Sequence, residues 1–318
     1  GRLAPVRARA QGLGLGKLRQ RSAAGAPAWR GAGSGGGGRG GGARIGIVLT
    51  EDRADAGFGD YEVAHGLGEA LERLGAEVAY LEAGARGWPR AAGSLDALVS
   101  LLDRFPVDRA PAGVTAVAWI RNWTERWLER PWFRRYDLVL VSSPPHTHAP
   151  AAMAALEAGR HVLCEKPMAL DALEARRMVE AAAASGALAL VDHELRFNPN
   201  RRRAKILVGD GYVGRVLHAS AVYRANIGRR HAHFNWWFQT ATGGGLLGAV
   251  GSHVVDTLRW WLGEVEEVDC RLRTFVETRP DRETGEPLAV ESDDFARFTL
   301  GMRDGATAEA SLSSVAPG

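Results

Sequence analysis

The sequence predicts an α/β Rossmann-like domain with a parallel sheet, followed by an α+β domain with a large, mainly antiparallel open sheet. In residues 44–190, short apolar runs alternate with amphipathic ones, which is typical of βα units on a parallel sheet. Beyond about Leu195, longer strand-like runs follow one another with few helices between them. This change of pattern sets residues 191–318 apart as a second domain. Because Pro317 and Gly318 directly follow a strand candidate, we expect its sheet to lack its last strands.

The first domain is predicted to contain five strands and three helices. Its strand candidates are the apolar runs Ile45–Leu49, Glu77–Leu81, Val114–Ile120, Leu138–Val141 and His161–Cys164. Helices are predicted over residues 62–74, from about 150 to 158, and from 171 onward, each followed by a glycine that ends it. The third helix begins at Asp171, whose spacing to Glu174 is that of a capping box.

The second domain contains four longer strand candidates and one prominent helix. The strands are predicted over residues 215–223, 265–277, 292–300 and 306–313. The helix is predicted from about Leu247 to Leu262, because Val250, Val254 and Leu258 recur at four-residue spacing and mark one buried face.

The basic character of the chain is confined to its first residues. Residues 1–43 hold eight of the 40 Lys and Arg residues, 14 of the 40 glycines and no acidic residue. From residue 44 onward, 32 basic residues face 37 acidic ones, so the body of the protein has no evident attraction to nucleic acid. Because residues 1–43 lack apolar periodicity, we expect them to form a disordered tail.

Composition also argues against several other classes. No apolar run approaches the length of a membrane span, and none has the form of a secretory signal. Cys164 and Cys270 are too few for a disulfide framework, which favours a cytoplasmic protein. His231 and His233 lack a third ligand nearby, so we predict no metal site.

A charged pair and a proline end the strand candidate at His161–Cys164. Glu165, Lys166 and Pro167 follow it directly. The carboxyl ends of parallel strands are where open α/β sheets bind their ligands, and proline fixes φ as the chain turns. The alternative interpretation is an ordinary ion pair at the surface.

His253 follows a triple glycine, Gly243–Gly245, on the predicted helix of the second domain. A histidine titrates near neutral pH and is therefore suited to take a hydroxyl proton while hydride leaves the same carbon. The alternative is a structural histidine on a half-buried helix. The glycines either allow close approach of the backbone to a substrate or form a tight turn, and both interpretations stay open.

Three stretches beyond residue 141 carry a family resemblance. They read SSPPHTHAPAAMAALEAGRHVLCEKPMAL at 142–170, HELRFNP at 193–199 and GGGLLGAVGSHVVDTLRWWLG at 243–263. In this order they resemble the glucose-fructose oxidoreductase and inositol dehydrogenase family, Gfo/Idh/MocA, over about residues 142–318. The resemblance implies NAD or NADP bound between a Rossmann domain and an α/β domain, and hydride transfer at a carbon of a sugar, inositol or similar polyhydroxylated substrate.

The same resemblance implies roles for individual residues. Lys166 would donate to the substrate oxygen, positioned by Glu165, and His253 would accept the proton. Relatives often carry an aspartate four residues before this histidine, where the present chain has Ala249. Dinucleotide contacts are implied for Ser143, Pro144, Pro145, His148, Glu165 and Lys166. Substrate contacts are implied for Arg196, Asn198 and Asp256, although Asp256 alternatively braces the helix.

The start of the first domain departs from this family. A dinucleotide-binding strand should run into G-x-G-x-x-G, so that backbone N–H groups bind the pyrophosphate. Here Gly57 and Gly59 stand eight and ten residues beyond the first strand, after three carboxylates that would repel a pyrophosphate: Glu51, Asp52 and Asp55.

Residues 44–143 instead resemble the N-terminal lobe of two-Rossmann (GT-B) glycosyltransferases, most closely through AWIRNWTERWLERPWFRRYDLVLVSS at 118–143. The chain is therefore interpreted as a hybrid, glycosyltransferase-like over 44–143 and oxidoreductase-like over 144–190 and beyond.

We predict an NAD(P)-dependent oxidoreductase of Gfo/Idh/MocA type. The alternatives are a catalytically silent binding or regulatory module of the same fold and a glycosyltransferase-derived hybrid. The expected partners are a small-molecule substrate and a second copy of the chain, docked through the open sheet. Neither nucleic acid nor a membrane is an expected partner.

Overall fold

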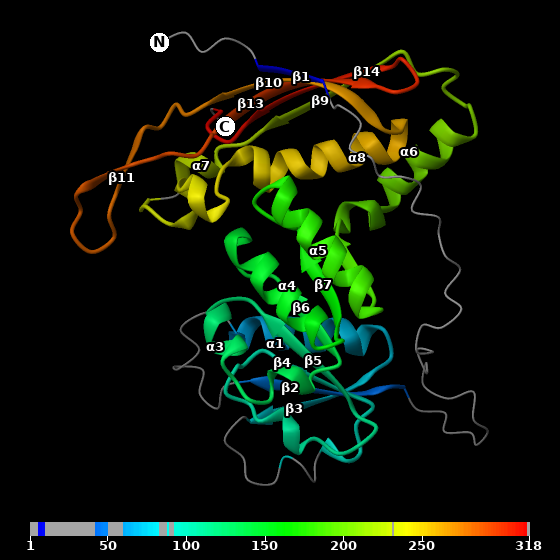
Figure 1. The fold of residues 1–318 in the computed structure, drawn as a ribbon, viewed down its shortest axis with the longest axis vertical. Helices are drawn as coiled ribbons and strands as arrows, with labels where there is room; N and C mark the ends of the chain where they lie inside the picture. The colour runs from blue at the N-terminus through cyan, green and yellow to red at the C-terminus, as the bar shows by residue number, and fades with distance from the viewer. Residues whose placement is uncertain are drawn as a thin grey trace. The chain divides into compact units, whose positions relative to one another are not determined.

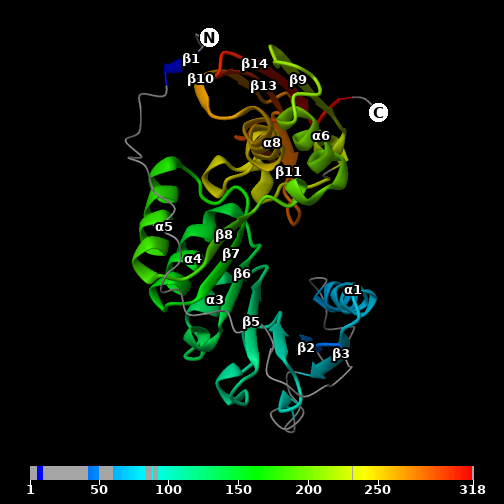
Figure 2. The same cartoon turned by 90° about the vertical axis from the view of Figure 1, so that its right-hand side faces the viewer.

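The computed structural model describes residues 6–9, 42–49, 60–82, 88, 92–230 and 232–316. They belong to two compact units, one within residues 22–191 and the other within residues 1–21 and 192–318. The predicted fold class is confirmed, because the first unit contains a parallel sheet and the second a mainly antiparallel one (Figures 1 and 2). Among the described helices, none is long and apolar enough to cross a membrane.

Seven strands form the sheet of the 22–191 unit, in the order β3-β2-β4-β5-β6-β7-β8 (Figure 1). The pairings from β3 to β7 are all parallel. The strands are β2 (Arg44–Leu49), β3 (Glu77–Glu82), β4 (Ala97–Ser100), β5 (Thr115–Ile120), β6 (Leu138–Val141), β7 (His161–Glu165) and β8 (Ala189–Asp192). Because β3 and β4 flank β2 on opposite sides, the carboxyl ends of β2 and β4 form the switch point at which such sheets bind ligands.

Among its described residues, this unit has the α-helices α1 (Asp60–Arg73), α3 (Thr124–Leu128), α4 (His148–Glu157) and α5 (Ala172–Ser185). Helix α4 packs on β6, β7 and α5 (Figure 2). The capping box predicted for α5 is confirmed, since Oδ1 of Asp171 accepts from the Glu174 N–H at 2.7 Å. Gly186 ends α5 in the left-handed conformation, with φ of 66°.

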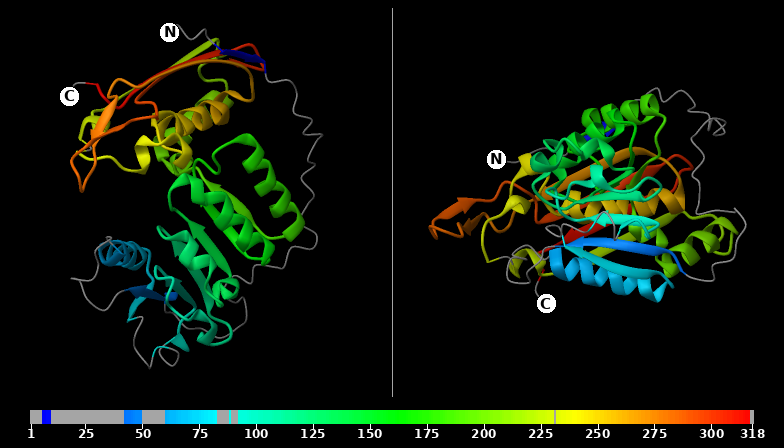
Figure 3. Two further views of the ribbon diagram at one scale, coloured as in Figure 1. Left: turned by 60° about the vertical axis from the view of Figure 1, so that its left-hand side comes forward. Right: turned by 90° about the horizontal axis from the view of Figure 1, so that it is seen from below.

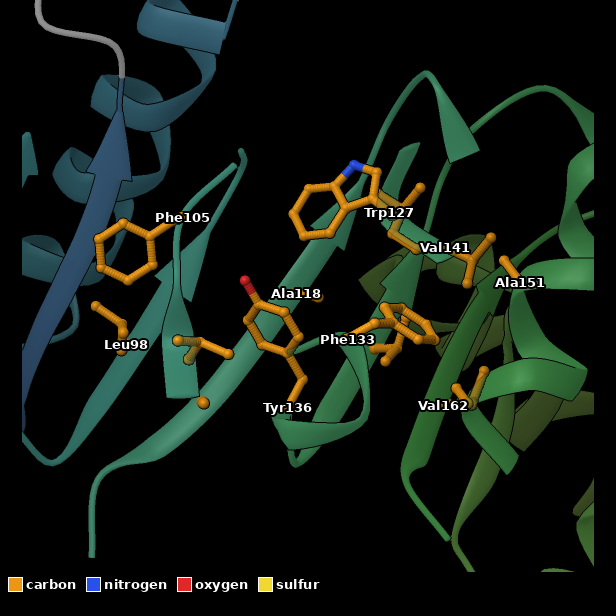
Figure 4. Close-up of a cluster of buried hydrophobic side chains, with 14 of the residues drawn as sticks. Leu98, Phe105, Ala118, Trp127, Phe133, Tyr136, Val141, Ala151 and Val162 are labelled. Carbon is orange, nitrogen blue, oxygen red and sulfur yellow. The ribbon is translucent and has the colours of Figure 1, made fainter. Parts of the chain in front are cut away.

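The core of the 22–191 unit joins the middle strands of the sheet to their connections (Figure 4). Phe105 and Tyr136 are completely buried there, and Trp127 is 2% exposed. Burial of a large apolar side chain stabilises a fold by about 1.5–3 kcal/mol. Burial also raises the pKa of the Tyr136 phenol, which therefore stays neutral. These contacts hold strands β4, β5, β6 and β7 in place. Residues of the candidate site follow the carboxyl ends of β6 and β7.

Five strands form the main sheet of the other unit, in the order β1-β10-β13-β14-β9. They are β1 (Val6–Arg9), β9 (His218–Arg224), β10 (Val265–Arg273), β13 (Phe295–Met302) and β14 (Thr307–Ser313). The pairings are antiparallel except that of β14 with β9. Helix α8 (Ser252–Leu262) lies along one face of this sheet (Figure 3), and its Leu258 packs with Phe298 and Leu312 in the core.

The prediction of a disordered tail over residues 1–43 does not hold for Val6–Arg9. These residues form β1, which pairs antiparallel with β10. An edge strand such as β10 offers unpaired backbone N–H and C=O groups, which a distant segment can satisfy without any local signal of its own. Residues 1–5 and 10–41 lie outside the described part of the chain.

The predicted helix over residues 247–262 is confirmed with one local difference. Its first turn, Leu247–Gly251, is a π-helix that continues directly into α8. Such turns are rare and occur frequently at functional sites. Two further helices and a hairpin of this unit were not predicted: α6 (Pro199–Gly209), α7 (Ile227–Arg230) and the pair of β11 (Thr278–Pro280) with β12 (Pro287–Ala289).

Candidate active site

His148 joins the two loops that leave the carboxyl ends of β6 and β7. The side chain is 1% exposed, with Nε2 at 2.7 Å from the Ser143 carbonyl oxygen and Nδ1 at 2.8 Å from that of Pro167. Both partners can only accept hydrogen bonds. Burial is the main influence on the imidazole and lowers the pKa of His148, with Lys166 and His146 acting in the same direction against the two carbonyls. The neutral ring therefore donates to one carbonyl, and its nitrogens are occupied by the protein itself.

Ser143, Pro144 and Pro145 form the turn at the end of β6. The Ser143 hydroxyl lies 2.5 Å from the Thr147 hydroxyl, which donates to the Pro144 carbonyl at 2.8 Å. Ser143 and Pro145 are buried and Pro144 is half-buried. Pro144 is thus the most accessible of the predicted dinucleotide contacts in this turn, whereas His148 and Ser143 hold the turn in shape.

Glu165 and Lys166 lie at the end of β7 as predicted, and both are half-buried. The Glu165 carboxylate accepts the backbone N–H of Lys166 at 3.0 Å, and the peptide bond from Lys166 to Pro167 is cis. Glu165 therefore fixes the backbone from which the Lys166 ammonium extends.

His253 is the second residue of α8, in the other unit, and only 13% of its side chain is exposed. Its Nδ1 atom is buried, while Nε2 lies 3.5 Å from Oε1 of Glu194. Glu194 begins a 3-10 turn, Glu194–Phe197, that follows β8. The nitrogen that can exchange a proton with a ligand is therefore Nε2, and it has a carboxylate beside it.

Asp256 is held by the protein rather than open to a ligand. It is 8% exposed, and Arg196 donates to both carboxylate oxygens, from Nε at 2.8 Å and from Nη2 at 2.5 Å. Nε2 of His193 lies 3.6 Å from the same carboxylate. Burial lowers the pKa of His193 and outweighs the opposing effect of Asp256. Of the two interpretations of Asp256, these contacts favour the brace.

Asn198 caps helix α6. Its side-chain oxygen accepts the backbone N–H groups of Asn200 at 3.0 Å and Arg201 at 3.3 Å. A substrate contact for Asn198 stays a prediction, and the contacts made by the side chain are structural.

The triple glycine forms a tight turn against the protein. A side chain at Gly244 would overlap the carbonyl oxygen of Trp237, and one at Gly245 would overlap the carboxylate of Asp293. Gly245 also has φ of 107°. Asp293 accepts the N–H of Leu247 at 2.8 Å and so caps the π turn that leads to His253. Of the two interpretations left open by the sequence, the geometry supports the turn.

The amino end of α1 carries an ion pair. Asp60, the first residue of the helix, is 8% exposed and its Oδ1 lies 2.7 Å from Nη1 of Arg121, just beyond β5. Burial is the largest influence and raises the pKa of Asp60, against the opposing effect of Arg121. Glu51, Asp52, Asp55, Gly57 and Gly59, on which the predicted departure from the glycine-rich loop depends, lie outside the described residues, as does His231.

Two family models match the chain. The GFO/IDH/MocA C-terminal domain matches residues 201–318, and the oxidoreductase family with an NAD-binding Rossmann fold matches residues 112–193. Over these residues the chain belongs to the Gfo/Idh/MocA oxidoreductase family. Lys166 falls within the Gfo/Idh/MocA Rossmann match and His253 within the C-terminal one. The Rossmann match begins after α1 and β4, so it leaves out the segment that departs from the family pattern.

Curated relatives support the same family. The chain is 32% identical to an uncharacterized oxidoreductase of Synechocystis sp. over 185 residues, which is 57% of this chain and 49% of that protein. It is 33% identical to the levoglucosan dehydrogenase of Pseudarthrobacter phenanthrenivorans over 145 residues, which is 45% of this chain and 37% of that enzyme. The chain thus spans at most about half the length of these relatives.

Solved structures share the fold across most of the chain. An oxidoreductase domain protein from Kribbella flavida matches with a TM-score of 0.60 and 30% identity, over 87% of this chain and 68% of that one. Levoglucosan dehydrogenase in complex with NADH and L-sorbose matches with a TM-score of 0.62 and 24% identity, over the same shares of the two chains, and shows a common fold. These comparisons give the predicted glycosyltransferase resemblance of residues 44–143 no support.

The described residues fit one end of a dinucleotide better than its middle. Glu82 is exposed at the carboxyl end of β3, where an acidic side chain binds the ribose hydroxyls of NAD in folds of this kind. The pyrophosphate belongs at the amino end of the first helix, but α1 begins there with Asp60 and Glu62. The Asp60 carboxylate already neutralises Arg121, so the described part of this region does not form an anion cradle.

Glu194 was missed as a site residue. It lies in the HELRFNP segment, but a glutamate between His193 and Leu195 gives no local signal of a contact with a helix almost 60 residues away. Its neighbour His253 was found through its place after the glycines.

Proposed function

We propose that this chain carries the catalytic residues of an NAD(H)-dependent oxidoreductase that acts on a hydroxyl-bearing carbon of a sugar, inositol or similar polyhydroxylated compound. The observation that carries the proposal is the pair of family matches, one containing Lys166 at the end of β7 and the other His253 on α8. Relatives named levoglucosan dehydrogenase and 1,5-anhydro-D-fructose reductase favour a carbohydrate substrate.

The residues divide the chemistry between them. Lys166 donates a hydrogen bond to the reacting oxygen and stabilises the negative charge that develops on it. His253 accepts the hydroxyl proton at Nε2, so the O–H bond breaks as the N–H bond forms and the carbon becomes a carbonyl. NAD, when bound, supplies the acceptor for the hydride that leaves that carbon. In the reverse direction His253 returns the proton and Lys166 polarises the carbonyl.

Both side chains suit these roles by their surroundings. Glu165 fixes the backbone of Lys166, and His148 fixes the loop that follows it. His253 stands on a helix whose first turn is capped by Asp293, and Nε2 is its exchangeable nitrogen. We infer NAD rather than NADP, because an exposed Glu82 would repel a 2′-phosphate.

A second candidate is a module of the same fold that binds no dinucleotide productively. The specific observation in its favour is the acidic first turn of α1, where a pyrophosphate would meet Asp60. The predicted homo-oligomer through the open sheet is compatible with either candidate and is tested by the mass of the protein in solution.

Titration of the protein with NADH and NADPH, followed by nicotinamide fluorescence, separates the two candidates. The proposed function predicts saturable binding of NADH at or below about 1 mM and weaker binding of NADPH. It also predicts reduction of NAD in the presence of polyols or sugars, measured at the absorbance of NADH. If neither cofactor saturates the protein at millimolar concentration, the second candidate replaces the first.

A further inference from the structure

Among the described residues, Glu194 places its carboxylate within ion-pair distance of Nε2, the exchangeable nitrogen of His253. Its Oε1 atom lies 3.5 Å from Nε2, a separation at which a protonated imidazole and a carboxylate attract each other without a fully formed hydrogen bond. The His253 side chain is 13% exposed and that of Glu194 is 50% exposed. The carboxylate is therefore the more solvated partner of this pair.

Two other positions on the helix of His253 were candidates for such a carboxylate, residues 256 and 249. Asp256, three residues further along α8, is held by two hydrogen bonds from Arg196 and faces His193. Residue 249, four positions before His253 on the same helical segment, is an alanine. Among the residues that the structure describes, Glu194 is the carboxylate within ion-pair distance of this imidazole.

We propose that Glu194 is a positioning residue for His253, supplying from the turn after β8 the negative charge that stabilises the imidazolium. The inference rests on the proposed function, in which His253 gains a proton as the substrate is oxidised. A nearby negative charge favours the charged form of an imidazole, so the ring becomes a stronger base at the moment of transfer. Because Glu194 is half-exposed, solvent and salt weaken this effect.

The electrostatic effects of the other charged groups around Glu194 and His253 partly cancel one another. Asp192, just before the turn, has its pKa raised by burial and by Glu194. His193 has its pKa lowered, chiefly by burial. Arg196 is neutralised by Asp256, and Arg201 donates to the Thr257 hydroxyl at 2.8 Å. None of these groups is a carboxylate that takes the place of Glu194 beside Nε2. Removal of the Glu194 charge should therefore lower the pKa of His253.

The test is the titration of His253 by NMR in the full chain, with the resonance assigned from its loss in a His253→Gln variant. Glu194→Gln keeps the size of the side chain and removes its charge, so the pKa of His253 should fall by about 0.5–1 unit. Glu194→Asp should retain part of the difference. Glu286→Gln, an exposed glutamate between β11 and β12, is the matched control and should leave the titration unchanged.

Kinetics distinguish this inference from the proposed function. In an active enzyme, the acidic limb of the plot of kcat/KM against pH should shift to lower pH in Glu194→Gln. The shift should equal the fall in the pKa of His253, and KM should change less than kcat. A shifted titration in a protein without dehydrogenase activity would uphold the role of Glu194 and contradict the proposed function. Active protein in which Glu194→Gln titrates like the Glu286→Gln control would overturn the role of Glu194 and leave the function intact.

Discussion

Replacement of His148 by alanine should destabilise the 22–191 unit severely, because the ring joins two loops from inside the protein. The neutral imidazole donates to one of two carbonyls, that of the buried Ser143 or that of the half-buried Pro167. A buried carbonyl left without its donor costs about 1–3 kcal/mol. The volume of the completely enclosed ring adds about 2 kcal/mol as an unfilled cavity. The expected loss in the free energy of unfolding is therefore about 3–5 kcal/mol.

Urea unfolding followed by circular dichroism measures this loss. His146→Ala is the matched control, since His146 lies in the same turn, is half-buried and lacks a hydrogen-bond partner at Nδ1 among the described residues. It should cost no more than about 1 kcal/mol. His148→Gln keeps a donor and should fall between the two. If His148→Ala unfolds with the same free energy as His146→Ala, the account of His148 as a buried link between the loops is wrong.

The same residue predicts a pH dependence. The pKa of His148 is lowered in the folded protein, so between the folded value and the ordinary value near 6.5 the unfolded chain binds the extra proton. Its contribution to stability is thus fully present above about pH 6.5 and is lost as the pH falls toward the folded pKa. In His148→Gln this part of the pH dependence should disappear, which urea titrations at about pH 5 and 7.5 would detect.

Two further predictions concern the unit that contains residues 192–318 and helix α1. Gly244→Ala should destabilise the protein by about 2 kcal/mol or more, because its methyl group meets the Trp237 carbonyl, whereas Gly66→Ala on α1 meets open space and should stabilise it by about 0.5–1 kcal/mol. Equal thermal shifts in the two variants would contradict this. Arg196→Met should lower the free energy of unfolding by about 2–3 kcal/mol, because the buried Asp256 carboxylate loses its partner. The double variant with Asp256→Asn should recover part of this loss. A double variant as unstable as Arg196→Met would argue against the pair.

Much of the fold was predictable because its signals are local. The apolar run at Leu138–Val141 is β6, and the spacing of Asp171 to Glu174 marks the start of α5. Strand β4 (Ala97–Ser100) was not predicted, and β1 forms by pairing with β10, which is remote in the sequence and leaves no local signal in residues 6–9. The same limit explains the hairpin of β11 with β12, whose residues are mostly exposed.

The candidate site was predictable by position and less so by role. Lys166 and His253 lie where the sequence placed them, at a strand end and on a helix. The protein partners of His148 and Asp256 were not predicted because they are remote in sequence: His148 bonds Pro167, and Asp256 bonds Arg196, 60 residues away. The ligand contacts expected of both residues stay predictions. Residue type and spacing show what chemistry a side chain can do, while its actual partners depend on tertiary structure.

The most direct test of the central claim is kcat/KM for oxidation of a polyol by the wild type, Lys166→Met, His253→Gln and the double variant. If both side chains act on one alcohol carbon, each single variant should lose about 100- to 10,000-fold, and the double variant much less than the product of the two losses. A single variant with wild-type kcat/KM, in protein that folds and binds NADH normally, would contradict the account.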